Sequence, residues 1–192
     1  FGEGVMGTGA VAGATYNTGM GYNALQDITS GDRNVAVGSR NAEALTTGSK
    51  NISLGHGALL GATAATSIIA IGDDSAGSLT TSTDPDGSIF IGNNAGNKIT
   101  SGIGNTAIGY QSLDAEDDGD FNTAIGYQAL TAQTGTSGEV SNTAVGYQSG
   151  VAITQGRYNT ILGKGALSSE DVGDRTVAIG YHALSSQNSD SD

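Results

Sequence analysis

A glycine with similar neighbours returns along the whole chain and constrains the architecture more than any other feature. Seven of the ten steps between successive copies are 17 residues long. Self-similarity at so short a period is typical of a solenoid, in which each unit buries its apolar face only by stacking on the next. The marker glycines are Gly7, Gly21, Gly38, Gly55, Gly72, Gly92, Gly109, Gly126, Gly146, Gly163 and Gly180.

The residues before each marker glycine alternate with a period of two, which is typical of a β-strand. The position just before the glycine is always apolar, and the position three before it is β-branched in ten of eleven units. We assign the first of these positions to the core and expect the residue between them, mostly alanine, to face the opposite, crowded side. The predicted structural core is Ile71, Ile91, Ile108, Ile125, Val145, Leu162 and Ile179.

We therefore predict an all-β protein, a parallel β-solenoid (β-roll) of about eleven coils with a dominant 17-residue period. The repeat domain covers residues 1–184, and a polar C-terminal tail covers 185–192. Pairs such as Ala129-Leu130 predict a second short strand in each coil. Glycines seven residues before the marker, such as Gly48 and Gly156, predict turns with positive φ. The extra residues of the two 20-residue steps fall in these turns, around 84–87 and 135–138.

Composition excludes several classes of partner. Nineteen acidic residues against seven basic ones give a net charge of −12, which repels both nucleic-acid phosphates and anionic lipid. We expect neither nucleic-acid binding nor membrane insertion, since no apolar run has the length of a span. The absence of cysteine excludes disulfides and thiolate metal sites. The chain opens without an initiator methionine, so we expect a fragment or processed product whose ends are capped by flanking domains or stacked copies.

A coil of 17 residues encloses little core, so we expect the chain to need partners. Small Ala and Gly columns suit close packing between chains under cyclic symmetry. With strands about 4.8 Å apart, eleven coils would make a rod roughly 50 Å long.

The run Asn-Thr-Ala-Ile-Gly-Tyr-Gln at residues 105–111, followed by Ser112-Leu113, resembles the repeats of bacteriophage tail-fibre proteins and related bacterial surface proteins. Its Ala-Ile-Gly core is similar to the head repeats of trimeric autotransporter adhesins. The resemblance implies a left-handed parallel β-roll assembled as an interlocked homotrimer, with Ile108 and its equivalents inside each roll. It also implies a structural, adhesive fibre segment on a virion tail fibre or cell surface that supports host attachment.

Tyrosine often follows the marker glycine, at a position that also accepts Ser39, Asp73 and Lys164 and is therefore predicted to be exposed. Two interpretations remain open for the Tyr and Gln columns. They form a structural ladder along the rod, or they contact a cell-surface glycan, since ring faces and amides match a pyranose. The candidate glycan-contact residues are Tyr110, Gln111, Tyr127, Gln128, Tyr147 and Gln148.

A column of asparagines predicts a hydrogen-bonded ladder between coils. Its members are Asn34, Asn51, Asn105, Asn122, Asn142 and Asn159.

Acidic clusters raise the possibility of calcium binding, which competes with a solvated loop. In the stretch 114–120 an EF-hand would need glutamate at the twelfth position, where Ile125 stands. The same alternatives apply to Asp84 with Asp86 and to Glu170 with Asp171 and Asp174. We predict no metal or cofactor site, and no cofactor.

No arrangement of residues predicts catalysis, and we expect no enzyme activity. The segment 2–7 fits G-x-G-x-x-G but lacks the preceding strand and following helix that nucleotide binding needs. His56 and His182 fall in exposed turns of coils far apart, and no Ser-His-Asp constellation accompanies them.

The leading functional hypothesis is a rigid fibre segment whose partner is itself, as a trimer with end-to-end stacking or flanking fibre domains. The alternative is a bacterial adhesin head that binds a glycan, matrix or protein receptor directly through its Tyr/Gln face. An ice-binding solenoid is disfavoured because no regular Thr-x-Thr array is present.

Overall fold

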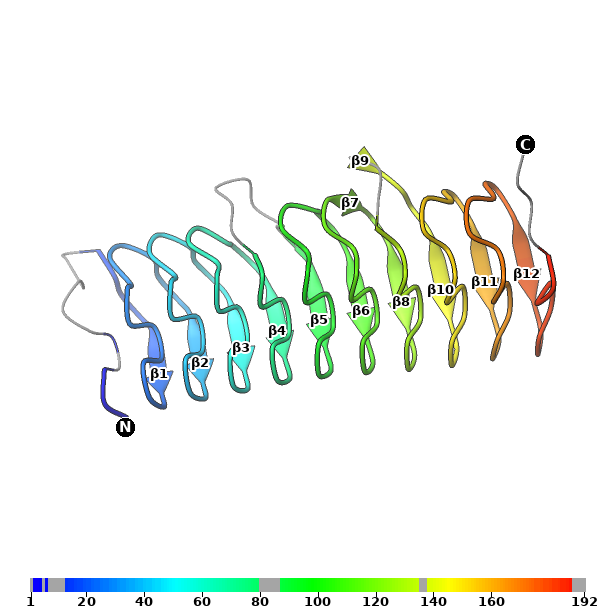
Figure 1. Cartoon of the computed structure of the whole chain (residues 1–192). Helices are drawn as coiled ribbons and strands as arrows, with labels where there is room; N and C mark the ends of the chain where they lie inside the picture. The colour runs from blue at the N-terminus through cyan, green and yellow to red at the C-terminus, as the bar shows by residue number, and fades with distance from the viewer. Residues whose placement is uncertain (1, 5, 7–12, 80–86, 135–137, 188–192) are drawn as a thin grey trace.

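The computed structural model describes residues 2–4, 6, 13–79, 87–134 and 138–187. They form an all-β parallel β-solenoid of roughly 9 turns with a period of about 17 residues, so the fold class is confirmed and the count of about eleven coils is corrected. The unit around Gly7 lies outside the described residues. Figure 1 shows the coils side by side along one axis, with β1 toward one end of the rod and β12 toward the other.

Ten strands of three residues form one parallel sheet, and consecutive strands in the sheet belong to consecutive coils. These strands are β1 (Thr18–Met20), β2 (Val35–Val37), β3 (Ile52–Leu54), β4 (Ile69–Ile71), β5 (Ile89–Ile91), β6 (Thr106–Ile108), β8 (Thr123–Ile125), β10 (Thr143–Val145), β11 (Thr160–Leu162) and β12 (Val177–Ile179). A second, two-stranded parallel sheet joins β7 (Gly119–Asp120) to β9 (Gly138–Glu139). Within the described ranges, no helix has the length and apolar character of a membrane span.

The strands stack in register even where the repeat lengthens. Ile108 pairs with Ile91 on one side and Ile125 on the other, and Ile71 pairs with Ile91 across a 20-residue step. The extra residues of the long steps therefore leave the strand ladder intact, as predicted. With strands about 4.8 Å apart, ten strands span roughly 43 Å.

The second short strand predicted at the Ala-Leu pair of each coil is absent from the described residues, and the additional strands β7 and β9 lie elsewhere in their coils. Ala129 and Leu130 lie in a turn, because Leu130 has a left-handed backbone with φ 50°. Both side chains are nevertheless completely buried. This turn folds the Ala-Leu pair into the coil interior, opposite the sheet.

The assignment of the core column was wrong. The middle residue of each strand points into the coil: Ala107, Ala124 and Ala144 are all 0% exposed. The residues on either side of it point outward. Ile71, Ile91, Ile108, Ile125 and Val145 are only partly buried, while Leu162 is 48% and Ile179 61% exposed. The period of two was correct, but its two faces were exchanged, because the narrow coil admits mostly a methyl group beside its inward-folded leucine. The crowded alanine face is the coil interior, so it is not a contact between chains.

Glycines let neighbouring coils approach at two positions, for different backbone reasons. The marker glycine Gly109 has φ 135°, a region that L side chains rarely adopt, and a Cβ there would strike the Gly126 carbonyl. Gly48 is not among the residues with positive φ, so that prediction was wrong. It is needed because a Cβ would collide with the Ala65 carbonyl of the next coil.

The β5 coil compensates for a large central side chain within its own interior. In the β6 and β8 coils a central alanine is combined with a leucine folded in from the turn, Ala107 with Leu113 and Ala124 with Leu130, and all four side chains are buried. In the β5 coil the central residue is Phe90, and the turn position holds Gly96. A Cβ added at Gly96 would lie on the Phe90 ring. The exchange of a large and a small residue keeps the interior filled.

This exchange generates a double-mutant prediction. Phe90→Ala should lower the free energy of unfolding by about 3–5 kcal/mol because it leaves a cavity. Gly96→Leu should lower it by about 1–3 kcal/mol or more because the leucine meets the ring. The double variant creates the Ala/Leu pair of the neighbouring β6 and β8 coils, so its loss should be smaller than the sum by more than about 1 kcal/mol in chemical denaturation. Additive losses would contradict the inward placement of Phe90.

Candidate functional site

The asparagine column forms a hydrogen-bonded ladder, which confirms the prediction. The backbone N–H of Asn51 donates to Asn34 Oδ1 at 3.1 Å, and Asn51 Oδ1 accepts from the Ile68 N–H of the next coil at 3.0 Å. Asn51 Nδ2 donates to Asn34 Oδ1 and to the Ala65 carbonyl, at 2.9 and 2.6 Å. The same backbone-to-Oδ1 bonds link Asn105, Asn122, Asn142 and Asn159. These buried amides tie successive coils together.

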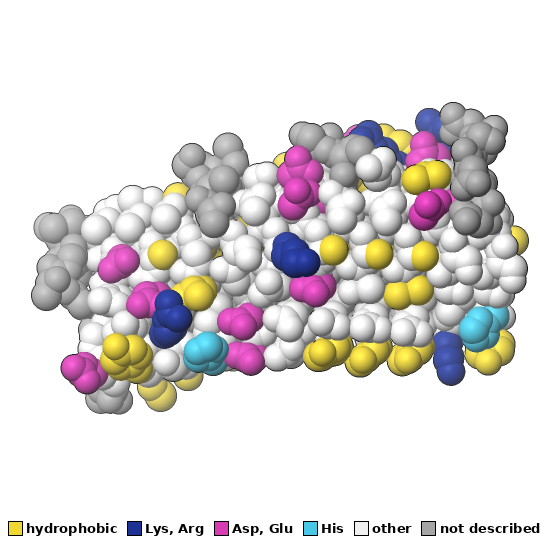
Figure 2. Space-filling model, viewed as in Figure 1, with side chains coloured by type: hydrophobic (Ala, Val, Ile, Leu, Met, Phe, Trp, Pro, Cys, Tyr) yellow, Lys and Arg dark blue, Asp and Glu magenta, His cyan; other side chains and the backbone are white. Residues whose placement is uncertain are grey.

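The tyrosines after β6, β8 and β10 stack into a continuous column. The ring centroids of Tyr110 and Tyr127 are 5.1 Å apart, and those of Tyr127 and Tyr147 are 5.3 Å apart, with interplanar angles of 16° and 9°. Lys164 extends the column, with its Nζ 5.4 Å from the centroid of the Tyr147 ring. Figure 2 shows a row of hydrophobic side chains along the lower edge of the rod.

A glutamine ladder runs beside the rings. Gln128 Nε2 donates to Gln111 Oε1 at 3.0 Å, and Gln148 Nε2 donates to Gln128 Oε1 at 2.9 Å. The three tyrosines are 42–46% exposed, as the sequence predicted. Their ring faces pack against one another, so a sugar would meet mainly ring edges and hydroxyls. The glycan-contact residues remain a prediction.

The acidic stretch 114–120 is not a simple solvated loop, because Glu116 is completely buried. Its Oε1 accepts the N–H groups of Gly119 at 2.8 Å and Asp117 at 3.1 Å. Its Oε2 accepts from Gln133 Nε2 at 2.6 Å, and Gln133 Oε1 accepts from Asn142 Nδ2 at 3.0 Å. Burial raises the pKa of the Glu116 carboxyl above its ordinary value of 4.5, although these hydrogen bonds lower it in part. Glu116 is therefore a structural link between coils.

Alignment to the period explains why this carboxylate is buried. Glu116 stands seven residues after its marker glycine, a position held by Ile99 and Ile153 in other coils. Glu170 occupies the same position, is also completely buried, and accepts the Gly173 N–H at 2.9 Å. The sequence contained this signal, but the acidic cluster obscured it. Asp84 and Asp86 lie outside the described residues.

Glu116 generates a prediction on pH. The folded chain holds the Glu116 proton more tightly than the unfolded chain does. Its contribution to the free energy of unfolding is therefore fully present below about pH 4.5 and is lost as the pH rises through the folded-state pKa. The natural chain should gain stability from this group as the pH is lowered from neutral to about 4.5. We expect Glu116→Gln to reduce that gain, as measured by urea denaturation. The matched control is Glu139→Gln, which removes an exposed carboxyl. Parallel pH profiles for the natural chain and Glu116→Gln would contradict the prediction.

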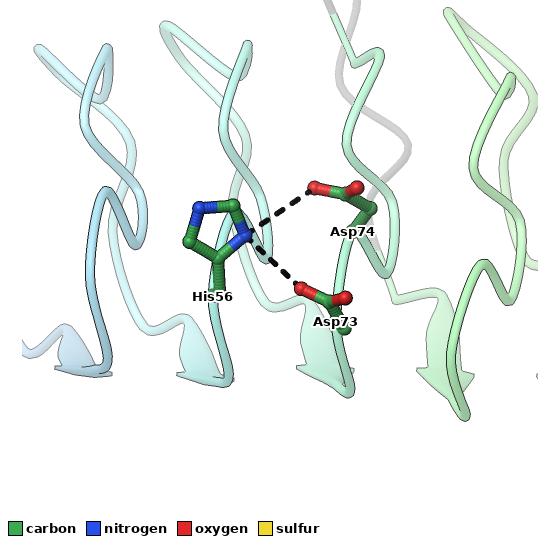
Figure 3. Close-up of side chains that lie close together, drawn as sticks. All are labelled: His56, Asp73 and Asp74. Carbon is green, nitrogen blue, oxygen red and sulfur yellow. Dashed lines mark hydrogen bonds and ion pairs between the residues drawn. The ribbon is translucent and has the colours of Figure 1, made fainter.

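A third constellation joins one histidine to two aspartates on neighbouring coils. His56 follows β3, and Asp73 and Asp74 follow β4 one repeat later. His56 Nδ1 lies 3.0 Å from Asp73 Oδ1 and 4.0 Å from Asp74 Oδ1. Figure 3 shows the imidazole and both carboxylates pointing toward one another from adjacent coils. The sequence interpretation missed this group, although His56 and Asp73 are separated by one 17-residue period.

His56 and His182 do not come together. His56 follows β3 and His182 follows β12, the last strand of the sheet. The His182 ring packs edge-on against Tyr181, with centroids 4.3 Å apart. Of the G-x-G-x-x-G segment at 2–7, residues 5 and 7 lie outside the described residues. Comparison with protein-family models, with curated proteins and with solved structures gives no match.

Proposed function

We propose that this chain is a structural, adhesive fibre segment, a rigid homotrimeric β-solenoid in a phage tail fibre or a similar surface fibre. The observation that carries the proposal is the outer face of the ten-stranded sheet. Two ranks of side chains cover it, one from the first and one from the third residue of every strand. The second rank is entirely aliphatic apart from Met20, and the first is β-branched throughout.

This face is continuous, largely apolar and open in the single chain, and five threonines of the first rank are the only polar residues among its twenty side chains. Met20, Ile52, Leu162, Val177 and Ile179 are 43–65% exposed. Parallel sheets are normally covered on both faces, and an exposed apolar patch of this kind marks an interaction surface. In this chain one face of the sheet covers the coil interior, and the other is open to a partner.

Charge favours a second copy of the chain as that partner. The chain carries a net charge of −12, so copies repel one another over most of their surfaces. The ten strands of the main sheet, all within the described ranges, contain no Asp, Glu, Lys or Arg. Copies can approach face to face across this strip without opposing like charges. The number three comes from the resemblance of the Asn-Thr-Ala-Ile-Gly-Tyr-Gln repeats to trimeric fibre proteins, together with the tendency of self-contacts to close cyclically.

The mechanism of such a segment is mechanical. The coils are joined by backbone hydrogen bonds and amide ladders, so the rod resists bending and pulling along its axis. Three rods sharing an aliphatic seam would hold a receptor-binding tip away from its anchor. A virion tail fibre or a cell surface is the corresponding location.

The aliphatic seam can be tested with a charge. Ile125→Asp places a carboxylate in the middle of the proposed interface, where burial without a partner is costly. We expect the natural chain to elute in light-scattering chromatography at about 57 kDa, three times the 19.0 kDa chain, and Ile125→Asp at the monomer mass. Tyr127→Ala is the control and should keep the trimer mass. A natural chain that is monomeric at micromolar concentration would refute the proposal.

The second candidate function is direct glycan recognition through the Tyr/Gln face, as in an adhesin head. The observation that favours it is the exposed column of Tyr110, Tyr127 and Tyr147 beside the glutamine ladder. The stacking of the rings weakens this candidate function. Sugars usually bind the apolar faces of aromatic rings, and here those faces pack against one another.

A glycan array separates the two functions. Direct recognition predicts reproducible hits with the natural trimer that are lost in Tyr127→Ala while the mass is unchanged. The spacer function predicts no hits. Hits that survive both Tyr127→Ala and Gln128→Ala would exclude this face as the glycan site.

A further inference from the structure

The group formed by His56, Asp73 and Asp74 has the donor atoms and spacing of a metal site. One imidazole nitrogen and one oxygen from each carboxylate all lie within 4.8 Å of one another. Two ligand atoms bound to a tetrahedral ion at about 2.1 Å are roughly 3.4 Å apart. The distances from His56 Nδ1 to the two aspartate oxygens, 3.0 and 4.0 Å, lie on either side of that value. Small side-chain rotations would therefore bring all three donors onto one ion.

The solenoid backbone holds these donors in place. His56 and Asp73 occupy the same column on adjacent coils, the column that forms the tyrosine ladder farther along the rod. The Asp74 N–H donates to the His56 carbonyl at 2.9 Å, which fixes one coil against the other. The site is thus built on the regular ladder, and no long loop has to close around the ion.

Gly57 leaves the space that Asp74 occupies. Most coils carry a side chain at the position of Gly57, such as Gln111 or Gln128. A Cβ at Gly57 would collide with Asp74 Oδ1. The glycine therefore lets the Asp74 carboxylate lie over the preceding coil, toward His56.

The charge of the group is unbalanced. Two carboxylates share one imidazole, and no lysine or arginine of the described residues forms an ion pair with Asp73 or Asp74. Arg40, in the coil before His56, pairs with Glu43 at 2.7 Å. The Asn93 amide donates to the other oxygen of Asp73 at 3.4 Å. Even with a protonated histidine the group is negative, and a divalent cation would neutralise it.

We propose that His56, Asp73 and Asp74 bind one divalent transition-metal ion per chain, of the Zn²⁺ or Co²⁺ type, which links the β3 and β4 coils. A mixed set of one nitrogen and two oxygen donors suits these ions. Ca²⁺ would require six to eight oxygens, which this group cannot supply. Solvent would complete the coordination, because all three side chains are at least 45% exposed.

The acidic group Glu116, Asp117 and Asp118 also has clustered oxygens but is a poor competitor. Both oxygens of Glu116 already accept hydrogen bonds from Gly119, Asp117 and Gln133. It also has no nitrogen donor.

The test uses Co²⁺ absorption spectroscopy and isothermal titration with ZnCl₂ on the full chain without a histidine tag. We expect one ion to bind per chain, and we expect the visible absorption spectrum of bound Co²⁺ to indicate a nitrogen ligand. His56→Ala should weaken binding at least tenfold, since even outer-shell changes cost about 10–100-fold. Asp74→Asn should act in the same direction. Gly57→Ala should also weaken binding while keeping all three donors, because the new Cβ displaces Asp74.

The matched control is His182→Ala, which removes a surface histidine that has no carboxylate partner among the described residues. Its affinity and stoichiometry should equal those of the natural chain. The absence of Zn²⁺ or Co²⁺ binding at millimolar metal would overturn the proposal, as would equal loss in His182→Ala and His56→Ala. Chromatographic mass measured on every variant keeps this result separate from the question of the trimer.

Discussion

Hydrogen bonding between successive coils is the constraint on which the rest of this structure depends. Each coil turns through non-glycine residues with left-handed backbones, including Gln111, Leu113 and Phe121 at φ 50–60°. Such conformations cost roughly 1–2 kcal/mol per residue. In each case the amide donates to a carbonyl of a neighbouring coil at 2.9–3.0 Å, to Asn93, Ala129 and Ile103 respectively. The hydrogen bonds between stacked coils offset the strain of the turn, so an isolated coil would not be stable in this conformation.

A narrow coil stacked in register turns every sequence position into a column along the rod. Inside, the columns are alanine, leucine and buried amides, and a rare exchange such as Phe90 with Gly96 is accommodated within one coil. Outside, a change in one or two neighbouring coils is enough to build a local group of side chains. His56 and Asp73 arise in this way from a column that elsewhere stacks tyrosines. The period therefore determines the architecture, and departures from the repeat determine the local surface chemistry.

The period of 17 residues made the parallel solenoid, the strand positions and the asparagine ladder predictable. Alternation alone could not say which face of a three-residue strand is inside, and the assignment of Ile108 and Ile125 to the interior followed hydrophobicity instead of available volume. In a coil this narrow, volume decides, so Ala124 is buried and Ile125 is not. The burial of Glu116 was not predicted because it stands in an acidic cluster, although its column position is held by Ile99 and Ile153 in other coils. The His56 group needed contacts across two coils, which a single repeat does not reveal.

The inward alanine and outward isoleucine are the central claim, and thiol labelling tests them most directly because the chain has no cysteine of its own. Single-cysteine variants at positions 124 and 125 would be labelled in the folded protein over a range of concentrations. The account predicts that Ala124→Cys stays protected at every concentration, while Ile125→Cys becomes reactive as dilution dissociates the proposed trimer. A reactive thiol at 124 together with a thiol at 125 that is protected at all concentrations would contradict it.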